Sequence, residues 1–211
     1  MTTFDLHDAL LPQNPEALAI QDLGGLFRLH LKKKMTALAS ICFTEIDQAF
    51  VIWGLVTLAI FSLAQFSTLA WTTQAIIDAP LTGIAIGLTS GITWTLASDE
   101  KLRWVVLLWA GLMAGGVGIT AYGVFEGVVF ILTNLCPIWL ALCALGYGLM
   151  SVGMRSHAFT AASLVHSVAI IAMPFQAHWQ LMDTGLVIAY TLFLFSVIPW
   201  DMQASETDNP C

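Results

Sequence analysis

The sequence predicts an all-α integral membrane protein: a bundle of six transmembrane helices with short loops, preceded by a cytoplasmic amphipathic helix. Of its 211 residues, 58% are hydrophobic and only 10% are charged, whereas soluble domains average about 45–50% apolar and about 25% charged residues. The apolar residues form long runs with almost no charge, and about 20 such residues cross a hydrocarbon core about 30 Å thick. A lone segment in lipid must satisfy its own backbone hydrogen bonds, so each run is expected to be a helix.

The long apolar runs divide into six spans. The run over residues 104–154 is too long for a single span and contains one charged residue, Glu126, so a tight turn is expected at residues 122–127. The expected spans are residues 50–71, 80–98, 104–122, 127–150, 158–175 and 181–200. Pro137 and Pro174 would each remove a backbone donor from a span, which predicts a loosened or kinked helix at both positions.

The seven Lys and Arg residues all fall on one side of the membrane when these spans alternate in direction. They are Arg28, Lys32, Lys33 and Lys34 before the first span, Lys101 and Arg103 between the second and third, and Arg155 between the fourth and fifth. The opposite connections, residues 72–78, 123–126 and 176–180, contain none. Because Lys and Arg near span ends stay on the cytoplasmic side, both termini are expected in the cytoplasm.

Residues 1–45 are expected to form a cytoplasmic arm that carries an amphipathic basic helix. Apolar residues recur at helical spacing from Phe27 to Cys42, beside the basic cluster of Arg28, Lys32, Lys33 and Lys34. Such a helix lies on the inner leaflet, where each basic residue adds about 1 kcal/mol of attraction to anionic lipid headgroups. A solvated helix whose charges only fix the orientation fits the same residues.

The arm is expected to end where the first transmembrane helix starts. Thr44 followed by Asp47 resembles a capping box, which predicts that a new helix begins there and continues as the first span. The transmembrane domain then covers residues 46–201, and a short acidic cytoplasmic tail covers residues 202–211. The polar, acidic start of the chain does not have the pattern of a cleavable signal peptide, so the first span is expected to act as signal and anchor.

Glycines are expected to form helix-packing faces in the second and third spans. Gly83, Gly87 and Gly91 repeat every four residues, and Gly111 and Gly115 continue the pattern in the next span. Small residues at this spacing let helix backbones approach closely in membranes. The predicted contacts are within the subunit or between subunits, and a narrow pathway lined by small residues and exposed carbonyl groups is the alternative.

His166 is expected near the middle of the fifth span. Charge at that depth costs at least about 2.5–3.5 kcal/mol on insertion scales, so its imidazole is expected to be hydrogen-bonded and to face the bundle interior. Asn134 and Gln65 fall at comparable depth, while Glu126 and Asp183 are expected toward the outer surface, together with Asp78 and His178. The candidate pathway residues are therefore His166, Asn134, Glu126, Asp183 and Gln65. A packing histidine, or a ligand of metal or haem, is the alternative for His166.

No sequence motif predicts catalysis, a cofactor or a metal site. Residues 87–91 read Gly-Leu-Thr-Ser-Gly, which is not the Gly-x-Ser-Gly of rhomboid proteases, and the chain contains neither His-Glu-x-x-His nor a Gly-Lys-Ser/Thr phosphate loop. The net charge of −7 comes from acidic residues spread over both faces, so it does not predict nucleic-acid binding. The protein is therefore expected not to be an enzyme.

In size and number of spans the chain is similar to the six-span acid-stress membrane proteins of the HdeD type and to bacterial urea and amide channels, without a motif of either family. The sequence favours passive or proton-linked passage of a small solute or ion through the bundle. The alternative is a non-transporting scaffold, or an assembly or stress-protection factor, that packs against partner membrane proteins or further copies of itself. The expected location is a bacterial inner membrane, with an internal photosynthetic membrane left open.

Overall fold

The computed structural model describes residues 44–99, 102–176 and 178–198, and this part of the chain is helical, with no strand. Its elements are α2 (Glu45–Phe66), α3 (Trp71–Asp99), α4 (Arg103–Phe125), α5 (Val129–Thr133), α6 (Leu135–Met154), α7 (His157–Ala172), the 3-10 helix η1 (Met173–Gln176) and α8 (Gln180–Val197). Six of them, α2, α3, α4, α6, α7 with η1, and α8, are long and apolar enough to span a membrane. The predicted six-helix membrane bundle is confirmed, while the basic cluster of the arm and the acidic tail lie outside the described residues.

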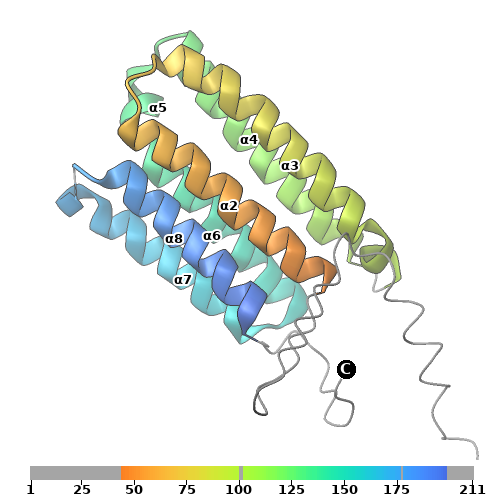
Figure 1. Cartoon of the computed structure of the whole chain (residues 1–211). Coiled ribbons are helices and arrows are strands. Elements are labelled where there is room, and N and C mark those ends of the chain that lie inside the picture. Colours follow the sequence, from red (N-terminus) through yellow and green to blue (C-terminus); the bar gives the residue numbers. More distant parts are fainter. Residues whose placement is uncertain (1–43, 100–101, 177, 199–211) are drawn as a thin grey trace, which may run out of the picture.

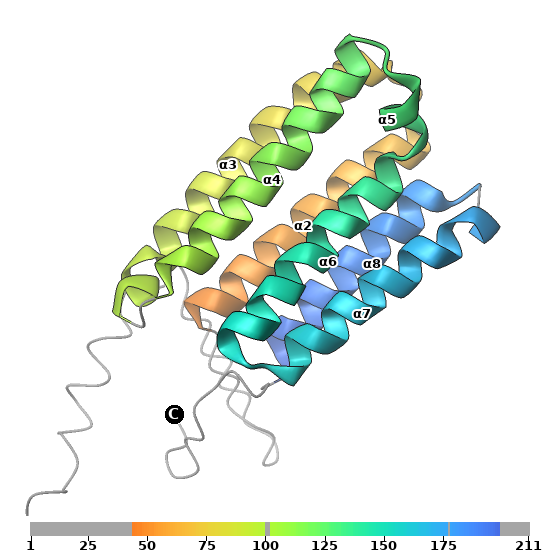
Figure 2. The ribbon, with the colours of Figure 1, turned by 180° about the vertical axis from the view of Figure 1, so that it is seen from behind.

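The helices form two groups that lie side by side (Figures 1 and 2). The hairpin of α3 and α4 lies against the other four long helices, with α3 packed on α2 and α4 packed on α6. Within the larger group, α2 packs on α8, and α6 contacts both α7 and α8. The six helices thus enclose two interior regions, one bounded by α2, α3, α4 and α6 and the other by α6, α7, α8 and α2.

The described arginines lie at one end of the bundle. Arg103 begins α4 and Arg155 follows α6, at the same end as the start of α2 and the end of α8. We call this the arginine end. The connecting residues 67–70, 126–128 and 178–179 lie at the opposite end. An even number of spans therefore places residues 44 and 198 on one side, and its assignment to the cytoplasm stays a prediction.

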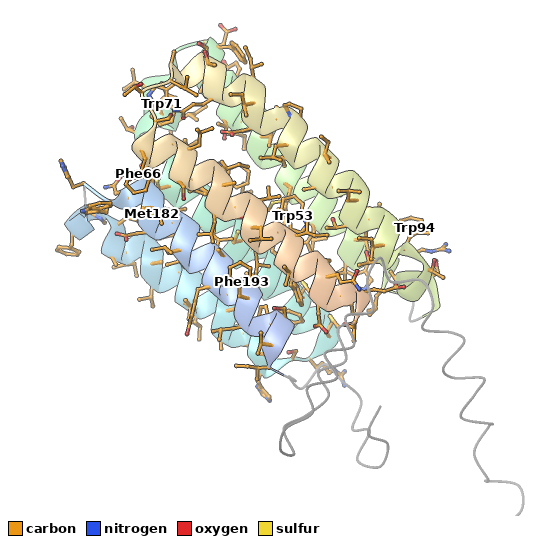
Figure 3. All side chains as sticks on the ribbon, viewed as in Figure 1. Trp53, Phe66, Trp71, Trp94, Met182 and Phe193 are labelled. Carbon is orange, nitrogen blue, oxygen red and sulfur yellow. The ribbon has the colours of Figure 1, made fainter. Side chains whose placement is uncertain are left out.

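Exposed aromatic side chains lie near both ends. Figure 3 shows Phe66 and Trp71 near the opposite end and Trp94 near the arginine end. Trp179 is exposed at the opposite end and Trp104 at the arginine end. Trp and Tyr favour the two interfaces of a bilayer, so their positions agree with helices that cross from one interface to the other.

The first transmembrane helix begins as the sequence predicts. The Thr44 hydroxyl accepts a hydrogen bond from the Asp47 backbone N–H (3.2 Å), and the Asp47 carboxylate accepts one from the Thr44 backbone N–H (2.9 Å). This reciprocal pair is the capping box, which satisfies backbone donors that have no partner within the helix. The prediction of a helix start at Thr44 is confirmed.

The first connection at the opposite end differs from the prediction. It was expected at residues 72–78, but α2 ends at Phe66 and α3 already begins at Trp71. The polar residues 72–74 and Pro80 favour a loop in this segment. The segment instead forms the first turns of a helix, with the proline in its interior. At 1.5 Å per residue, its 29 residues extend about 43 Å. Asp78, expected on an outer rim, therefore lies two turns inside a span.

The fourth span is interrupted near the opposite end. The predicted tight turn is present: α4 ends at Phe125, and Gly127 adopts a positive φ of 64°, which glycine does without strain. The short helix α5 and the break at Asn134 then replace the first turns of the expected span. Pro137 consequently lies in the first turn of α6, where its missing N–H needs no partner. Pro174 lies in η1, beyond the end of α7.

A cluster of buried aromatic side chains lies where α6, α7 and α8 meet. Tyr147 of α6 is buried, and its ring centroid lies 5.1–6.2 Å from those of Trp109, Phe159, His166 and Phe195. Aromatic pairs at such separations contribute about 0.5–1.5 kcal/mol each beyond the area that they bury. The rings of Tyr147, Phe159 and Phe195 belong to one cluster of buried hydrophobic residues, which we call the aromatic core.

Within the described chain, glycines mediate close helix packing at positions other than the five predicted ones. A Cβ on Gly116 of α4 would lie 2.8 Å from the Trp139 ring of α6, and a Cβ on Gly146 of α6 would lie 2.9 Å from the Trp109 ring of α4. The predicted packing glycines are Gly83, Gly87, Gly91, Gly111 and Gly115, and a Cβ on any of them meets no atom within 4 Å. Within the described chain these five positions therefore make no close packing contact, and contact with another protein stays a prediction.

Candidate functional site

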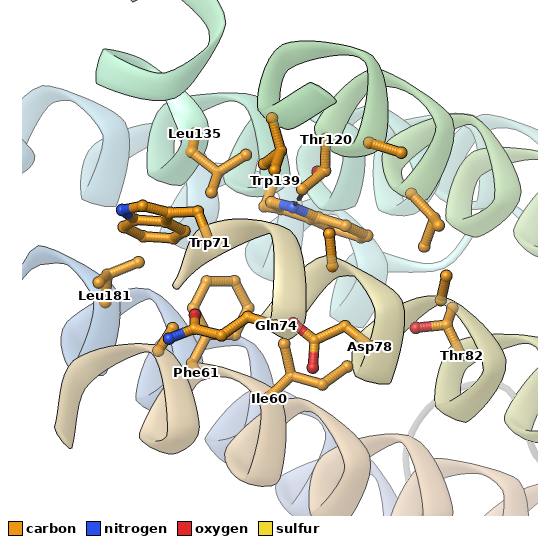
Figure 4. A pocket seen from close by; sticks show the side chains of 16 residues that line it. Ile60, Phe61, Trp71, Gln74, Asp78, Thr82, Thr120, Leu135, Trp139 and Leu181 are labelled. Atoms are coloured by element: carbon orange, nitrogen blue, oxygen red, sulfur yellow. Dashed lines mark hydrogen bonds between the residues drawn. The ribbon is translucent and has the colours of Figure 1, made fainter. Parts of the chain in front are cut away.

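The region bounded by α2, α3, α4 and α6 contains a cavity of about 50 Å³. A water molecule needs at least about 10–15 Å³ of such space, so the cavity has room for a few water-sized groups. Its walls are mostly apolar, and the polar side chains that reach it come from α3 and α4. They are Gln74, Asp78, Thr82 and Thr120. The rings of Trp71, Trp139 and Phe61 line it as well (Figure 4).

Asp78 is the charged residue of this cavity. In Figure 4 its carboxyl group lies between Trp139 of α6 and Ile60 of α2. Its Oδ1 is buried and has no hydrogen-bond partner among the described residues. The residues that line the cavity include no Lys, Arg or His, and the two arginines of the described part begin or follow helices at the arginine end. The carboxyl group therefore has neither a cation nor a donor for Oδ1 in the described part of the chain.

Gln74, one turn before Asp78, is bonded to the connection that precedes α3. Gln74 is only 4% exposed, and its Nε2 donates to Ser67 Oγ (3.0 Å) and to the Leu69 carbonyl oxygen (3.2 Å). These bonds join the start of α3 to the connection before it. They use only Nε2, so Gln74 Oε1 can still accept a hydrogen bond. The bonds also explain why polar residues 72–74 form a helix rather than a loop.

Thr120 links the α4 wall to Trp139. Its hydroxyl donates to the Gly116 carbonyl oxygen (2.8 Å) and accepts a hydrogen bond from Trp139 Nε1 (3.2 Å). The indole is thereby fixed over Gly116, where no side chain stands in its way. The hydrogen bond at Nε1 and the contact of the ring with Gly116 both fix the orientation in which Trp139 lines the cavity.

A second cavity of about 40 Å³ lies next to the first, on the side of the arginine end. The two share Ile60, Phe61, Thr82 and Trp139 as lining residues. Trp53 lines the second cavity, and its Nε1 donates to Thr89 Oγ1 (3.1 Å), so α2 and α3 are joined at its level. The two cavities together follow the interior from Trp71, near the opposite end, toward Trp53.

Two of the predicted pathway residues, Gln65 and Asp183, lie at the contact between α2 and α8. Gln65 Nε2 donates to the His178 carbonyl oxygen (3.2 Å), and its Oε1 accepts from the Met182 backbone N–H (3.4 Å). Asp183 lies in the first turn of α8, with a buried Oδ2 that has no hydrogen-bond partner in the described part. Neither residue lines one of the two cavities.

Asn134 and Glu126 flank α5 and also lie away from the cavities. The Asn134 side chain donates to the Phe130 carbonyl oxygen (2.8 Å), one turn earlier in the chain. Glu126 follows α4 and is exposed. Both positions are at the opposite end of the bundle, so Asn134 is less deep in the span than its place in the sequence suggested.

His166 is fully buried in the aromatic core rather than in a cavity. Its Nδ1 forms a hydrogen bond with the Ala162 carbonyl oxygen (2.8 Å), and its ring packs against Tyr147 at 5.2 Å. The expectation of an interior, hydrogen-bonded imidazole is met at Nδ1, whereas Nε2 has no partner among the described residues. His166 lines neither cavity, and no hydrogen bond joins it to the other four predicted pathway residues in the described part of the chain.

Sequence reasoning missed Asp78 as an interior group because it took the surrounding residues for a loop. One signal could have found it: starting the second span at Trp71 would have placed Trp71, Gln74, Asp78 and Thr82 on one helix face, at spacings of three and four residues. No group of three or more His, Cys, Asp or Glu side chains in the described ranges could hold a metal ion. Cys136 and Cys143 are buried, free thiols in α6.

The comparisons add no relative to this picture. No protein-family model matches the chain, and neither the curated proteins nor the solved structures include a match. The architecture itself therefore supports the conclusion that the chain is a polytopic, multi-pass membrane protein, because six of its helices are long and apolar enough to cross a bilayer.

Proposed function

We propose that this protein passes a small ion or solute across the membrane through the region bounded by α2, α3, α4 and α6, with Asp78 as the binding group. The observation that carries the proposal is the buried Asp78 Oδ1, which lines a cavity and lacks a hydrogen-bond partner in the described residues. An ionisable side chain within a span costs free energy and in membrane proteins commonly marks an ion or substrate pathway. The proposed role is not catalytic.

The arrangement of the two cavities supports passage rather than simple binding. The cavity at Asp78 adjoins Trp71, which is 46% exposed at the start of α3. The second cavity continues from Thr82 to Trp53, where the hydrogen bond to Thr89 joins α2 and α3. A solute bound at Asp78 would thus be next to the exposed Trp71 on the side of the opposite end. On the side of the arginine end, the hydrogen bond between Trp53 and Thr89 would close its path.

The test is a flux measurement on purified protein in liposomes. Uptake of protons, ammonium ions, urea and small weak acids is followed for the wild type and for Asp78→Asn. Asp183→Asn is the matched control, because Asp183 also has a buried carboxyl oxygen without a hydrogen-bond partner but lines neither cavity. We expect Asp78→Asn to lose most of the flux and Asp183→Asn to keep it. Equal flux in the wild type and Asp78→Asn would refute the proposal.

The basic residues support an orientation for this passage. Seven Lys and Arg residues fall on one side of six alternating spans, and such residues are retained on the cytoplasmic side. We therefore propose a bacterial inner-membrane or internal photosynthetic-membrane protein with both termini in the cytoplasm. In this orientation the Trp71 end of the cavity faces away from the cytoplasm, and the basic arm can contact anionic lipid headgroups.

A second candidate function is favoured by the glycines of the α3–α4 hairpin. Gly83, Gly87 and Gly91 on α3 and Gly111 and Gly115 on α4 are exposed and meet no other helix of the described chain. Small residues at four-residue spacing commonly form contacts between membrane helices. A scaffold that holds partner membrane proteins, or further copies of this chain, through this face would explain them.

The scaffold alternative makes a separable prediction. Gly87→Leu and Gly115→Leu are expected to break up a complex or oligomer that co-purifies with the chain, with no direct effect at Asp78. Ala161→Leu is the matched control, since Ala161 is also small and exposed but lies on α7. Cross-linking in native membranes followed by mass determination distinguishes the two results. An unchanged assembly in both glycine variants would rule out the hairpin face as a scaffold.

A further inference from the structure

We infer that the solute of the Asp78 cavity is a small organic ammonium ion, of about the size of methylammonium. This inference rests on the proposed function and names its substrate class. It combines three properties of the cavity at Asp78: its charge, the chemistry of its walls and its volume.

The charge of the cavity selects a cation. Asp78 is the charged side chain among the lining residues, which include no basic group. The arginine that begins α4 is engaged elsewhere: Arg103 lies over the Trp94 ring at 5.2 Å, and its Nε donates to Ser98 Oγ (2.7 Å). An anion would find no positive partner at Asp78 within the described chain, whereas a cation would find a carboxyl oxygen without a competing donor.

The walls favour an organic cation over an alkali metal ion. A dehydrated metal ion such as K⁺ needs several oxygen ligands to replace its water shell. Here the Thr120 hydroxyl is already bonded to Trp139 and to a backbone carbonyl group, so the side-chain oxygens that remain around the cavity are those of Asp78, Gln74 and Thr82. The rings of Trp71, Trp139 and Phe61 contribute instead. Aromatic faces attract ammonium groups and also pack against their methyl groups, which is the combination found in aromatic cages.

The volume sets the upper size. The cavity of about 50 Å³ has room for only a few water-sized groups. An ion with one nitrogen and one or two carbon atoms fits this space. A large lipophilic cation such as tetraphenylphosphonium does not. The adjoining cavity of about 40 Å³ is of similar size, so the same limit applies on the way to the arginine end.

Trp71 is the residue through which this inference can be tested. Its ring lines the cavity but is 46% exposed at the start of α3, so replacing it disturbs the core less than replacing Trp139. Trp179 is the matched control: it lies at the same end, is 48% exposed, and packs against Phe66 without lining a cavity. Trp71→Leu removes the aromatic face, and Trp71→Phe keeps one.

The experiment measures transport currents on a supported membrane with the full chain in proteoliposomes. Methylammonium, K⁺, Na⁺ and tetraphenylphosphonium chlorides are applied in turn at fixed pH. We expect currents with methylammonium that exceed those with K⁺ or Na⁺ and no current with tetraphenylphosphonium. Loss of one cation–π contact predicts that Trp71→Leu lowers the apparent methylammonium affinity about fivefold, with Trp71→Phe close to the wild type and Trp179→Leu unchanged.

The outcomes separate this inference from the proposed function. If Asp78→Asn abolishes a proton or alkali-ion current while methylammonium gives none, the substrate class is wrong and the proposed function stands. If Asp78→Asn changes no current, both fail. Should Trp71→Leu not fold, as judged by its elution and helix content, the wild-type preference for methylammonium over K⁺ still decides the question. A wild type that prefers K⁺ overturns the inference.

Discussion

Replacing Asp78 by leucine should make the protein more stable and inactive at the same time. The two side chains have the same number of heavy atoms and the same branch point, so leucine fits the space that the carboxyl group occupies. The substitution removes Oδ1, a buried acceptor without a partner in the described residues. It also adds apolar surface to a wall that Ile60, Phe61 and Trp139 already make apolar.

The size of the gain follows from the cost of an unsatisfied buried polar atom. That cost is about 1–3 kcal/mol, and 1 kcal/mol shifts the Tm of a chain of this length by about 2–4 °C. Asp78→Leu is therefore expected to raise the Tm by about 2–12 °C. Asp47→Leu is the contrasting variant, because the Asp47 carboxylate accepts hydrogen bonds from the backbone N–H and the hydroxyl of Thr44. Loss of this capping box is expected to cost about 0.5–2 kcal/mol.

The assay is thermal unfolding of the purified protein in one detergent, followed by tryptophan fluorescence at a fixed heating rate. The wild type and the two aspartate variants are compared side by side, and liposome flux is measured on the same preparations. The expected signs are opposite: Asp78→Leu unfolds at a higher temperature and Asp47→Leu at a lower one. A lower Tm for Asp78→Leu would show that the carboxyl group makes a stabilising interaction, and the argument for an unsatisfied binding group would then be lost.

Two further predictions concern packing. Gly116→Leu is expected to destabilise the bundle by about 1–3 kcal/mol or more through overpacking, because an added Cβ would meet a tryptophan ring at 2.8 Å, whereas Gly87→Leu, with open space around it, should leave the Tm of the monomer unchanged. Equal losses in both variants would contradict the packing described for α4 and α6. Tyr147→Ala is expected to cost about 3–5 kcal/mol, as for other large core aromatics. Tyr190→Ala, at a position that is 66% exposed, should cost far less, and a urea or detergent denaturation series measures both.

The number of spans and the start of the first helix could be predicted because they depend on local properties. Long apolar runs, with Lys and Arg confined to every second connection, determine the number of spans. The spacing of Thr44 and Asp47 determines the start of the first helix. The start of α3 could not be predicted in the same way. Polar residues 72–74 favour a loop in isolation, and only the contacts of Gln74 with Ser67 and Leu69 show how a helix accommodates them.

The candidate site was missed for the same reason, since its central residue lies in that segment. Asp78 becomes an interior residue only when α3 is extended to Trp71. Glycine spacing also could not assign the packing contacts within the chain, because the sequence shows where small residues recur but not which face a neighbouring helix covers. Gly116 and Gly146 pack because tryptophans of the facing helix project onto them, whereas Gly87 has no such neighbour. These are properties of pairs of helices, and a single helix does not encode them.

The tryptophans and phenylalanines that rest on glycines fit two pairs of helices closely together. Between α4 and α6 the fit is reciprocal, with Trp109 of α4 over Gly146 and Trp139 of α6 over Gly116. Between α2 and α8 it is reciprocal again, since Phe193 lies over Gly54 and Phe61 lies over Gly185. Two helices that each place a large ring against a glycine of the other resist sliding, because a shift would drive both rings into bulkier side chains. Among the described long helices, α3 and α7 have no such joint, because a Cβ on the α3 glycines would meet nothing and α7 contains no glycine, so sliding along the neighbouring helices should be easiest for these two.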